Sequence, residues 1–385
     1  MPLSRRSAPD AQPNALAAAR ERLGDARVLD LSDTNPTRHR LTDPAVSDVV
    51  ARAASRPPSY DPDPRGPVAA REALAARFGG HPSDYWLAAG TSVAYDWLFA
   101  LLLDVGDAVA VPQPGYPLVE PLARLSGVVT AGYPAYYLHP HGWEYDLDAL
   151  NRLLTRPDGR PVGAVVAVHP NNPTGAYADA GLVDACARTG TPLIADEVFW
   201  PFAVEAVAPA PRLSGATATL TFGLDGLSKL LAAPALKLSW IRLSGPATDV
   251  ARAAPVLDRI ADAYLPVSTP VAEALPDLLA LADAAIARIR SRLAINMAVA
   301  REFFGEAPYR ARHVDGGWTV LVDVPRAVDG DVAVALLEQA HIAVQPGWLY
   351  DLDSPGALAL SLLPGPATFT DGCRRLRDAV ATLVG

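Results

Sequence analysis

A lysine in an apolar setting is the residue of this sequence that most clearly could do chemistry. Lys229 follows the β-like run Thr219–Phe222 and is surrounded by small and apolar residues. Burial there would lower the pKa of the lysine and leave a nucleophilic amine, which a lysine that forms an imine requires. The same residue could instead lie at the surface and cover apolar neighbours with its aliphatic stem. Polar residues upstream favour the first interpretation.

Two other polar motifs follow apolar runs earlier in the chain. Asp196 ends the run Leu193–Ala195, where a carboxylate can pair with a protonated ring nitrogen or cap a helix. Asn172 comes shortly after the run Ala164–Val168, and its amide can donate to a phenolate oxygen, although Asn-Pro also makes ordinary turns. The order of these motifs before Lys229 is far more specific than any one of them.

A third polar segment predicts an anion site. Gly90, Thr91 and Ser92 open a helix that is expected to run to Leu103. The backbone amides at a helix N-terminus, together with the two hydroxyls, suit a phosphate group. The same residues could also serve only to cap the helix.

Alternating helices and short β-branched runs between about residues 66 and 290 must position these groups. Such alternation predicts a mainly parallel sheet, covered on both faces, with ligands bound beyond the strand ends. A helical tract over residues 272–304 leads to a second unit, with strand-like runs at Trp318–Val324 and Ala357–Leu363. The expected division is an N-terminal segment (residues 1–45) that joins the small domain, a large domain (46–290) and a small C-terminal domain (291–385).

Composition excludes several classes of protein. Half of the 385 residues are apolar and 19% are charged, so a large core is expected and disorder is not. The net charge of −9 comes without a basic block, which argues against a nucleic-acid partner. The chain has two cysteines, without the spacing of a metal site, and no metal is expected.

The sequence also bears on the compartment. Arg5 and Arg6 near the N-terminus are not followed by the apolar stretch of a secretory signal. No apolar run is long enough for an ordinary membrane span. We therefore expect a soluble, cytoplasmic protein that does not bind a membrane.

In their order, these motifs resemble the fold-type I pyridoxal-phosphate (PLP) enzymes of the class I/II aminotransferase family. The resemblance covers nearly the whole chain and implies an α/β fold, with a mainly parallel sheet in a large domain and a smaller α+β domain. Further matching segments are Asn35-Pro36, Tyr60 with Gly66, Gly106-Asp107, Pro114-Gly115-Tyr116 and Pro346-Gly347.

The resemblance implies a role for each matching residue. Lys229 would form the internal aldimine with PLP and later shuttle the α-proton, and Ser228 beside it would lie in the cofactor site. Asp196 would hold the pyridine nitrogen, Asn172 the ring hydroxyl, and Tyr116 would stack on the ring. The phosphate would bind at Gly90, Thr91 and Ser92. Tyr60 would reach the phosphate of the neighbouring subunit, which implies a homodimer.

Three positions depart from the family pattern. Lys237 stands eight residues after Lys229, where the family commonly has a phosphate-binding arginine, and an ammonium loses the bidentate fork. Phe199 stands where a tyrosine usually donates to the cofactor. The late strand Ala357–Leu363 lacks the arginine that usually binds the substrate carboxylate. Arg38, with Asn35, is a candidate replacement. These departures resemble a less characterised bacterial branch of the family.

Three functions remain open at this stage. The first is an aminotransferase that moves an amino group between an amino acid and a 2-oxo acid. The second is a PLP-dependent lyase, cyclase or decarboxylase on the same scaffold, which the missing arginine and Phe199 favour. The third is a regulator that binds PLP without catalysis, although the first 30 or so residues are too short for a DNA-binding segment.

Trp318 is expected in a turn into a strand, or in the substrate channel.

Overall fold

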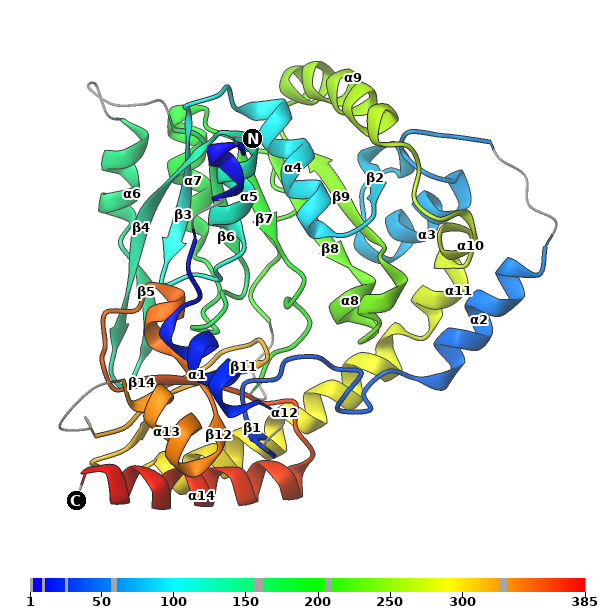
Figure 1. Cartoon of the computed structure of the whole chain (residues 1–385). Helices are drawn as coiled ribbons and strands as arrows, with labels where there is room; N and C mark the ends of the chain where they lie inside the picture. The colour runs from blue at the N-terminus through cyan, green and yellow to red at the C-terminus, as the bar shows by residue number, and fades with distance from the viewer. Residues whose placement is uncertain are drawn as a thin grey trace.

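The computed structural model describes residues 3–8, 11–24, 27–56, 61–155, 162–204, 209–325 and 331–384. Within these residues the largest unit is an eight-stranded sheet in the order β2-β9-β8-β7-β6-β3-β4-β5 (Figure 1). Its strands are β2 (Tyr85–Ala88), β3 (Ala108–Gln113), β4 (Val129–Leu138), β5 (Gly142–Tyr145), β6 (Val162–Val168), β7 (Leu193–Asp196), β8 (Thr221–Gly226) and β9 (Ser239–Ser244). Strands β4, β3, β6, β7 and β8 pair in parallel. The predicted mainly parallel α/β sheet is confirmed.

Helices cover both faces of this sheet, as its apolar strands require. Val166 packs in one cluster with α4 and α9, whereas its neighbour Val165 packs in another with α6 and α7, because successive side chains of a strand point to opposite faces. The third cluster joins α2, α3, α8, α10 and α11 to β2 and β9. The helices are α2 (Pro44–Ala54), α3 (Val68–Phe78), α4 (Thr91–Leu102), α5 (Val119–Ser126), α6 (Leu147–Leu154), α7 (Ala180–Thr189), α8 (Leu227–Leu230), α9 (Ala247–Tyr264), α10 (Thr269–Glu273) and α11 (Leu275–Ala280).

A smaller antiparallel sheet, in the order β10-β11-β14-β13, lies beside the long helix α12. Figure 1 shows α12 (Ala282–Phe304) and α14 (Pro366–Val384) together along the edge of the molecule remote from α9. The strands of the smaller sheet are β10 (Arg310–Ala311), β11 (Thr319–Asp323), β13 (Gln345–Pro346) and β14 (Ala357–Ser361). The remaining helix of this part of the chain is α13 (Val332–Ala340). Short 3₁₀ turns are η1 (Arg5–Ser7), η2 (Pro82–Asp84), η3 (Pro234–Leu236) and η4 (Gly347–Tyr350).

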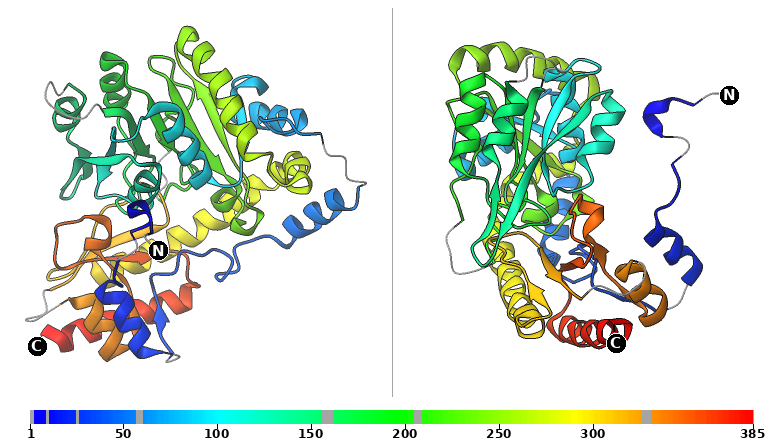
Figure 2. Two further views of the ribbon diagram at one scale, coloured as in Figure 1. Left: turned by 45° about the horizontal axis from the view of Figure 1, so that its top comes forward. Right: turned by 90° about the vertical axis from the view of Figure 1, so that its left-hand side faces the viewer.

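The N-terminal residues contact both units. Strand β1 (Leu29–Asp30) pairs in parallel with β12 (Ile342–Ala343), and α1 (Ala15–Leu23) packs against α13. Further upstream the arm reaches α5, where Arg6 Nη1 donates to the carbonyl of Leu125 at 3.2 Å. Figure 2 shows this arm running along one side of the molecule.

The expected helical tract over residues 272–304 differs from the structure. It is divided into α10, α11 and α12, and Pro276 lies in the first turn of α11. A proline is tolerated there because the first-turn N–H has no helical partner, but it cannot continue a preceding helix. The division of the chain at residue 290 stays a prediction, and α12 passes through that boundary. None of the described helices is both long and apolar enough to cross a bilayer.

Candidate active site

A pocket of about 240 Å³ lies beyond the carboxyl ends of β6, β7 and β8. This is where open parallel sheets place their ligands. The predicted site residues that line it are Gly90, Thr91, Ser92, Tyr116, Asn172, Asp196, Phe199, Ser228, Lys229 and Lys237. Asn35 and Arg38 do not line it, and Tyr60 lies outside the described residues.

Lys229 reaches the pocket from the short helix α8, which begins directly after β8. The side chain keeps part of its surface open to the pocket, and burial lowers the pKa of the amine, while the charge of Asp196 acts in the opposite direction. Its Nζ lies 5.6 Å from the ring centre of Phe199 and 5.5 Å from that of Trp318. Within the described residues no carboxylate forms an ion pair with Lys229. The amine is therefore enclosed by rings and open towards a ligand.

Asp196 is the last residue of β7 and is buried. Its Oδ2 accepts a hydrogen bond from the Tyr95 hydroxyl at 3.1 Å, and its Oδ1 accepts one from the Val198 N–H at 3.3 Å. Burial raises the pKa of Asp196 to about 6, although these two donors and Lys229 oppose the shift. An ionised carboxylate here would gain most from a cationic ligand atom.

Tyr95 was not predicted from the sequence, although its spacing could have revealed it. It follows Ser92 by three residues on α4, and residues at this spacing share one face of a helix. The helix that presents the predicted anion site therefore also supplies a donor to Asp196.

The loop before α4 and Lys237, which were predicted to bind an anion, lie close together. Gly90 has a φ of +138°, which side chains rarely adopt, and no side chain caps α4. A Cβ on Gly90 would lie 3.6 Å from Lys237 Nζ, so the ammonium reaches the N-terminus of this helix. First-turn N–H groups, the hydroxyls of Thr91 and Ser92, and this ammonium together suit a phosphate.

Asn172 and Tyr116 lie on loops that are tied together. The Asn171 side chain donates from Nδ2 to the carbonyl of Pro114 at 2.9 Å, and this bond joins the loop after β6 to the loop after β3. The Oδ1 atom of Asn172 is buried and has no partner within the described residues. Tyr116 is 47% exposed although it lines the pocket. Unpaired buried polar atoms are uncommon, and a ligand is one explanation for this one.

The remaining wall comes from segments that the motif pattern did not include. Thr34, Trp318 and Thr319 line the pocket, and the ring centre of Trp318 lies 5.4 Å from that of Phe199. Trp318 lies in a bend directly before β11, as expected, and it also lines the pocket. Other lining residues that sequence reasoning missed are Leu118, Val119, Val168, Val198, Pro234, Leu238 and Ser239.

The structure does not bring the expected carboxylate anchor to the pocket. The Arg38 side chain is 70% exposed, and its Nη1 lies 3.4 Å from Asp33 Oδ2. Among the described lining residues the only basic side chains are Lys229 and Lys237, and β14 carries no arginine. Neither Arg38 nor the late strand places a guanidinium at this pocket.

The donor set matches the chemistry of pyridoxal phosphate. An anion site with an ammonium, a buried carboxylate, an unpaired amide and a partly enclosed amine converge on one pocket. Phosphate, ring nitrogen, ring hydroxyl and aldehyde are the groups that these side chains could bind.

Comparisons with known proteins agree with this geometry. A family model described as aminotransferase class I and II matches residues 28–370. The alanine aminotransferase of Mycobacterium tuberculosis is 30% identical over 244 residues, which cover 60% of this chain and 54% of that protein. Human tyrosine aminotransferase is 26% identical over 227 residues, which cover 56% of this chain and 48% of that protein. The chain thus spans about half the length of these curated relatives.

Two solved structures show the same fold over nearly the whole chain. An alanine aminotransferase from Pyrococcus furiosus superposes with a TM-score of 0.86 at 21% identity and covers 99% of this chain and 100% of its own. An aspartate aminotransferase double mutant from Thermus thermophilus gives 0.82 at 22% identity, with 98% and 100% covered. Because the family model spans most of the sequence, the chain belongs to the class I and II aminotransferase family.

Proposed function

We propose that this chain is a PLP-dependent aminotransferase that moves an amino group between an amino acid and a 2-oxo acid. The observation that supports this most is that the partly enclosed Lys229 amine and the buried Asp196 carboxylate line the same pocket. Bound PLP would supply an electron sink that makes the substrate Cα–H acidic.

Each residue would have a task that its own contacts support. Lys229 would hold the cofactor covalently, and its released amine would accept a proton at Nζ, because the lowered pKa leaves more of that amine neutral. Asp196 holds the ring nitrogen, and the Tyr95 hydroxyl keeps Oδ2 of Asp196 in place. Asn172 binds the ring hydroxyl and Tyr116 covers the ring.

The phosphate end would be held by Gly90, Thr91, Ser92 and Lys237. The Lys237 ammonium is a point charge without the planar fork of a guanidinium. The orientation of the phosphate would therefore depend mainly on the backbone N–H groups of α4. Ser228 and Phe199 complete the wall of the cofactor site.

A lyase, cyclase or decarboxylase is the second candidate. It is favoured by a specific observation, since the described lining of the pocket contains no arginine for a substrate carboxylate. The reaction depends on which bond at Cα stands perpendicular to the cofactor ring, and a carboxylate anchor is one device that fixes this orientation.

A single-turnover assay of the PLP-loaded protein with a panel of amino acids distinguishes the two. Formation of a stoichiometric 2-oxo acid together with the amino form of the cofactor supports amino transfer. Release of ammonia, carbon dioxide or a cyclised product without the amino form supports the second candidate and overturns the first.

We also propose a homodimer in which Tyr60 of the partner subunit reaches the phosphate end. Large apolar side chains are exposed on the described segments 61–68 and 265–273, with Val68 at 54% and Leu265 at 62%. Val68 lines a groove between residues 61–68 and 266–273. Exposed apolar side chains around a groove support contact with another subunit.

The three-part domain division and the cytoplasmic location stay predictions. Both cysteines, Cys186 and Cys373, are buried and unpaired, as a reducing compartment would allow. Amino acids and 2-oxo acids are the proposed small-molecule partners.

A further inference from the structure

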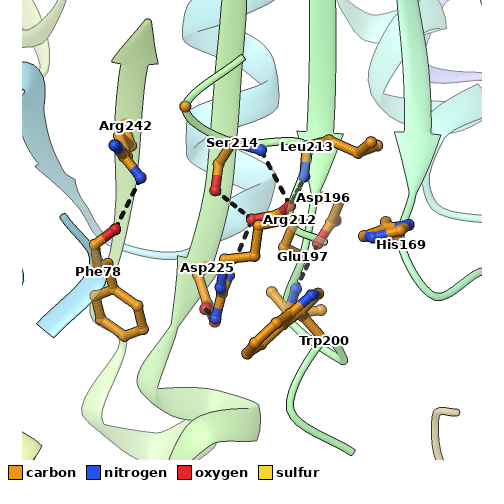
Figure 3. A network of polar contacts seen from close by, with 12 residues as sticks. Phe78, His169, Asp196, Glu197, Trp200, Arg212, Leu213, Ser214, Asp225 and Arg242 are labelled. Carbon is orange, nitrogen blue, oxygen red and sulfur yellow. Dashed lines mark hydrogen bonds and ion pairs between the residues drawn. The ribbon is translucent and has the colours of Figure 1, made fainter. Parts of the chain in front are cut away.

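A second polar cluster lies on the face of the sheet opposite the pocket (Figure 3). Asp196 pairs in register with Leu224, so the next residues along, Glu197 and Asp225, are neighbours on adjacent strands. Because side chains alternate between faces, both point away from the pocket that Asp196 lines. Glu197 is 1% and Asp225 3% exposed.

A segment of residues 210–215, here called the strap, crosses this face. Trp200 Nε1 donates to the Ala210 carbonyl at 2.8 Å, and the backbone N–H groups of Leu213 and Ser214 donate to Glu197 Oε1 at 2.6 and 3.1 Å. The Gly215 N–H donates to the Ser244 hydroxyl at the end of β9 at 3.1 Å.

The strap is also fixed to the loop after β6. His169 Nδ1 accepts from the Ala178 N–H at 2.8 Å, which assigns the ring proton to Nε2, and this nitrogen lies 3.1 Å from the carbonyl of Pro211. Burial lowers the pKa of His169, so the ring is neutral and donates to the strap. The ends of β6, β7 and β9 are therefore all bonded to one short segment.

Arg212 lies at the centre of these contacts. Its Nη1 donates to Glu197 Oε2 at 2.9 Å and its Nη2 to Asp225 Oδ2 at 3.2 Å, so one guanidinium bridges the ends of β7 and β8. The guanidinium carbon lies 4.1 Å from the ring centre of Trp200 and 5.1 Å from that of Phe78. Two carboxylates and two rings hold its position.

The strap lies directly on β8. A Cβ on Gly223 would lie 2.2 Å from Ser214 Cβ and 3.3 Å from Ser214 Cα, so only glycine allows this approach. Such close contact transmits a displacement of the strap to the strand beneath it.

We propose that Arg212 is a positioning residue, which sets the spacing of Asp196 and Lys229 from behind the sheet. The proposal rests on the proposed cofactor. Asp196 immediately precedes Glu197, and Lys229 follows Asp225 by four residues. The Arg212 guanidinium therefore bridges the two segments whose side chains would both bind the cofactor ring. Small errors in the position of such groups are costly, because the ligand binds both at once.

The competing explanation is that the ion pairs only stabilise the fold, and a matched control separates the two. Arg312 is buried, donates to Asp323 at 2.6 Å, and has its guanidinium carbon 5.3 Å from the ring centres of both Tyr137 and Trp143. It lies between the small sheet and β4 and β5, and does not line the pocket. Arg312→Met therefore removes a similar set of contacts without touching the strap.

The test compares Arg212→Met, Arg212→Lys and Arg312→Met in equilibrium titrations of full-length apoprotein with PLP, followed by tryptophan fluorescence. Both methionine variants should lose thermal stability. Only Arg212→Met should weaken PLP binding, by about 10- to 100-fold, and shift the pH midpoint of the cofactor's visible absorption. Arg212→Lys should recover part of the affinity, and Arg312→Met should stay within about threefold of wild type.

If Arg212→Met does not fold, Asp225→Asn takes its place, since it removes one bridged charge and keeps the shape. Wild-type affinity and an unchanged pH midpoint in the folded variant would overturn the proposal, as would equal weakening by Arg312→Met. Failure of the wild-type protein to bind PLP would instead count against the proposed function.

Discussion

The two faces of the sheet at the ends of β7 and β8 use buried polar groups in opposite ways. On the strap face, Glu197 accepts hydrogen bonds from Leu213, Ser214 and Arg212. On the pocket face, Asn172 has a buried unpaired oxygen, and Lys229 has no ion-pair partner within the described residues. The faces are separated by the thickness of one strand.

The difference indicates which cluster is scaffold and which is site. A buried charge with every acceptor paired stabilises a structure and leaves little for a ligand to bind. A buried group that lacks a partner costs free energy in the free protein, and a ligand can recover that cost. Asp196 accepts hydrogen bonds from Tyr95 and Val198 but has no ion-pair partner within the described residues, whereas its neighbour Glu197 is paired with Arg212. The missing cation distinguishes the two carboxylates.

The largest effect is expected on the pocket face. Lys229→Ala removes the amine that would hold the cofactor and move the proton, and amino transfer should fall by at least about 1,000-fold. The measurement is the rate of 2-oxo acid formation at saturating amino acid. Lys237→Ala is the matched control, and it should reduce PLP affinity while some transfer remains. Comparable turnover by Lys229→Ala would refute the assignment.

On the strap face, Glu197→Gln should reduce the free energy of unfolding by about 3 to 5 kcal/mol, because it breaks a buried ion pair. The amide nitrogen of the glutamine would also face hydrogen-bond donors, because both Arg212 and the strap N–H groups donate to this position. Urea denaturation measures this loss. A change below about 1 kcal/mol would mean that the strap network is not the scaffold described above.

Asp196→Asn should have the opposite sign in the cofactor-free protein. Burial raises the pKa of Asp196 from 3.8 to about 6, so the folded state holds more protons than the unfolded state between these values. Stability therefore falls as pH rises through this window, and the ionised carboxylate destabilises the apoprotein at pH 7 by about 3 kcal/mol. The asparagine variant should recover this at pH 7 and gain nothing near pH 4.

Denaturation of both apoproteins at pH 4 and pH 7 measures this difference. The same variant should bind PLP more weakly than wild type. A variant that is less stable than wild type at pH 7 would place Asp196 with the scaffold and remove the contrast between the two faces.

The smallest effect is expected at the anion site. Lys237→Arg restores the residue common in the family, and its fork could bind phosphate at two points. We expect PLP affinity to change by less than about tenfold, because the backbone N–H groups of α4 remain. Titration with PLP and with inorganic phosphate measures it. A much larger loss would mean that the geometry of the ammonium is essential.

The sequence predicted the pocket face better than the strap face for a physical reason. Asn172, Asp196 and Lys229 follow apolar strands, and parallel strands bring their carboxyl ends to one edge. Arg212 lies in an irregular Pro- and Ser-containing segment, where an arginine is normally exposed, and only its contacts with distant rings and carboxylates enclose it.

The sequence pattern also did not predict the pocket wall that the smaller sheet contributes. Thr34 and Trp318 reach the pocket because the N-terminal segment and β11 pack beside the large sheet, and this depends on contacts between distant parts of the chain. Arg38 follows Thr34 by four residues, and its side chain remains in solvent. Proximity in sequence to a pocket residue did not predict which side chain enters.

The proposed function requires Lys229 to hold PLP covalently in this pocket. The direct test is to incubate the protein with PLP, reduce it with borohydride, and locate the added mass by peptide mass spectrometry. We expect one cofactor per chain on Lys229, with none on Lys237 and none in Lys229→Ala. Stoichiometric attachment to another lysine, or no attachment to the folded wild-type protein, would contradict it.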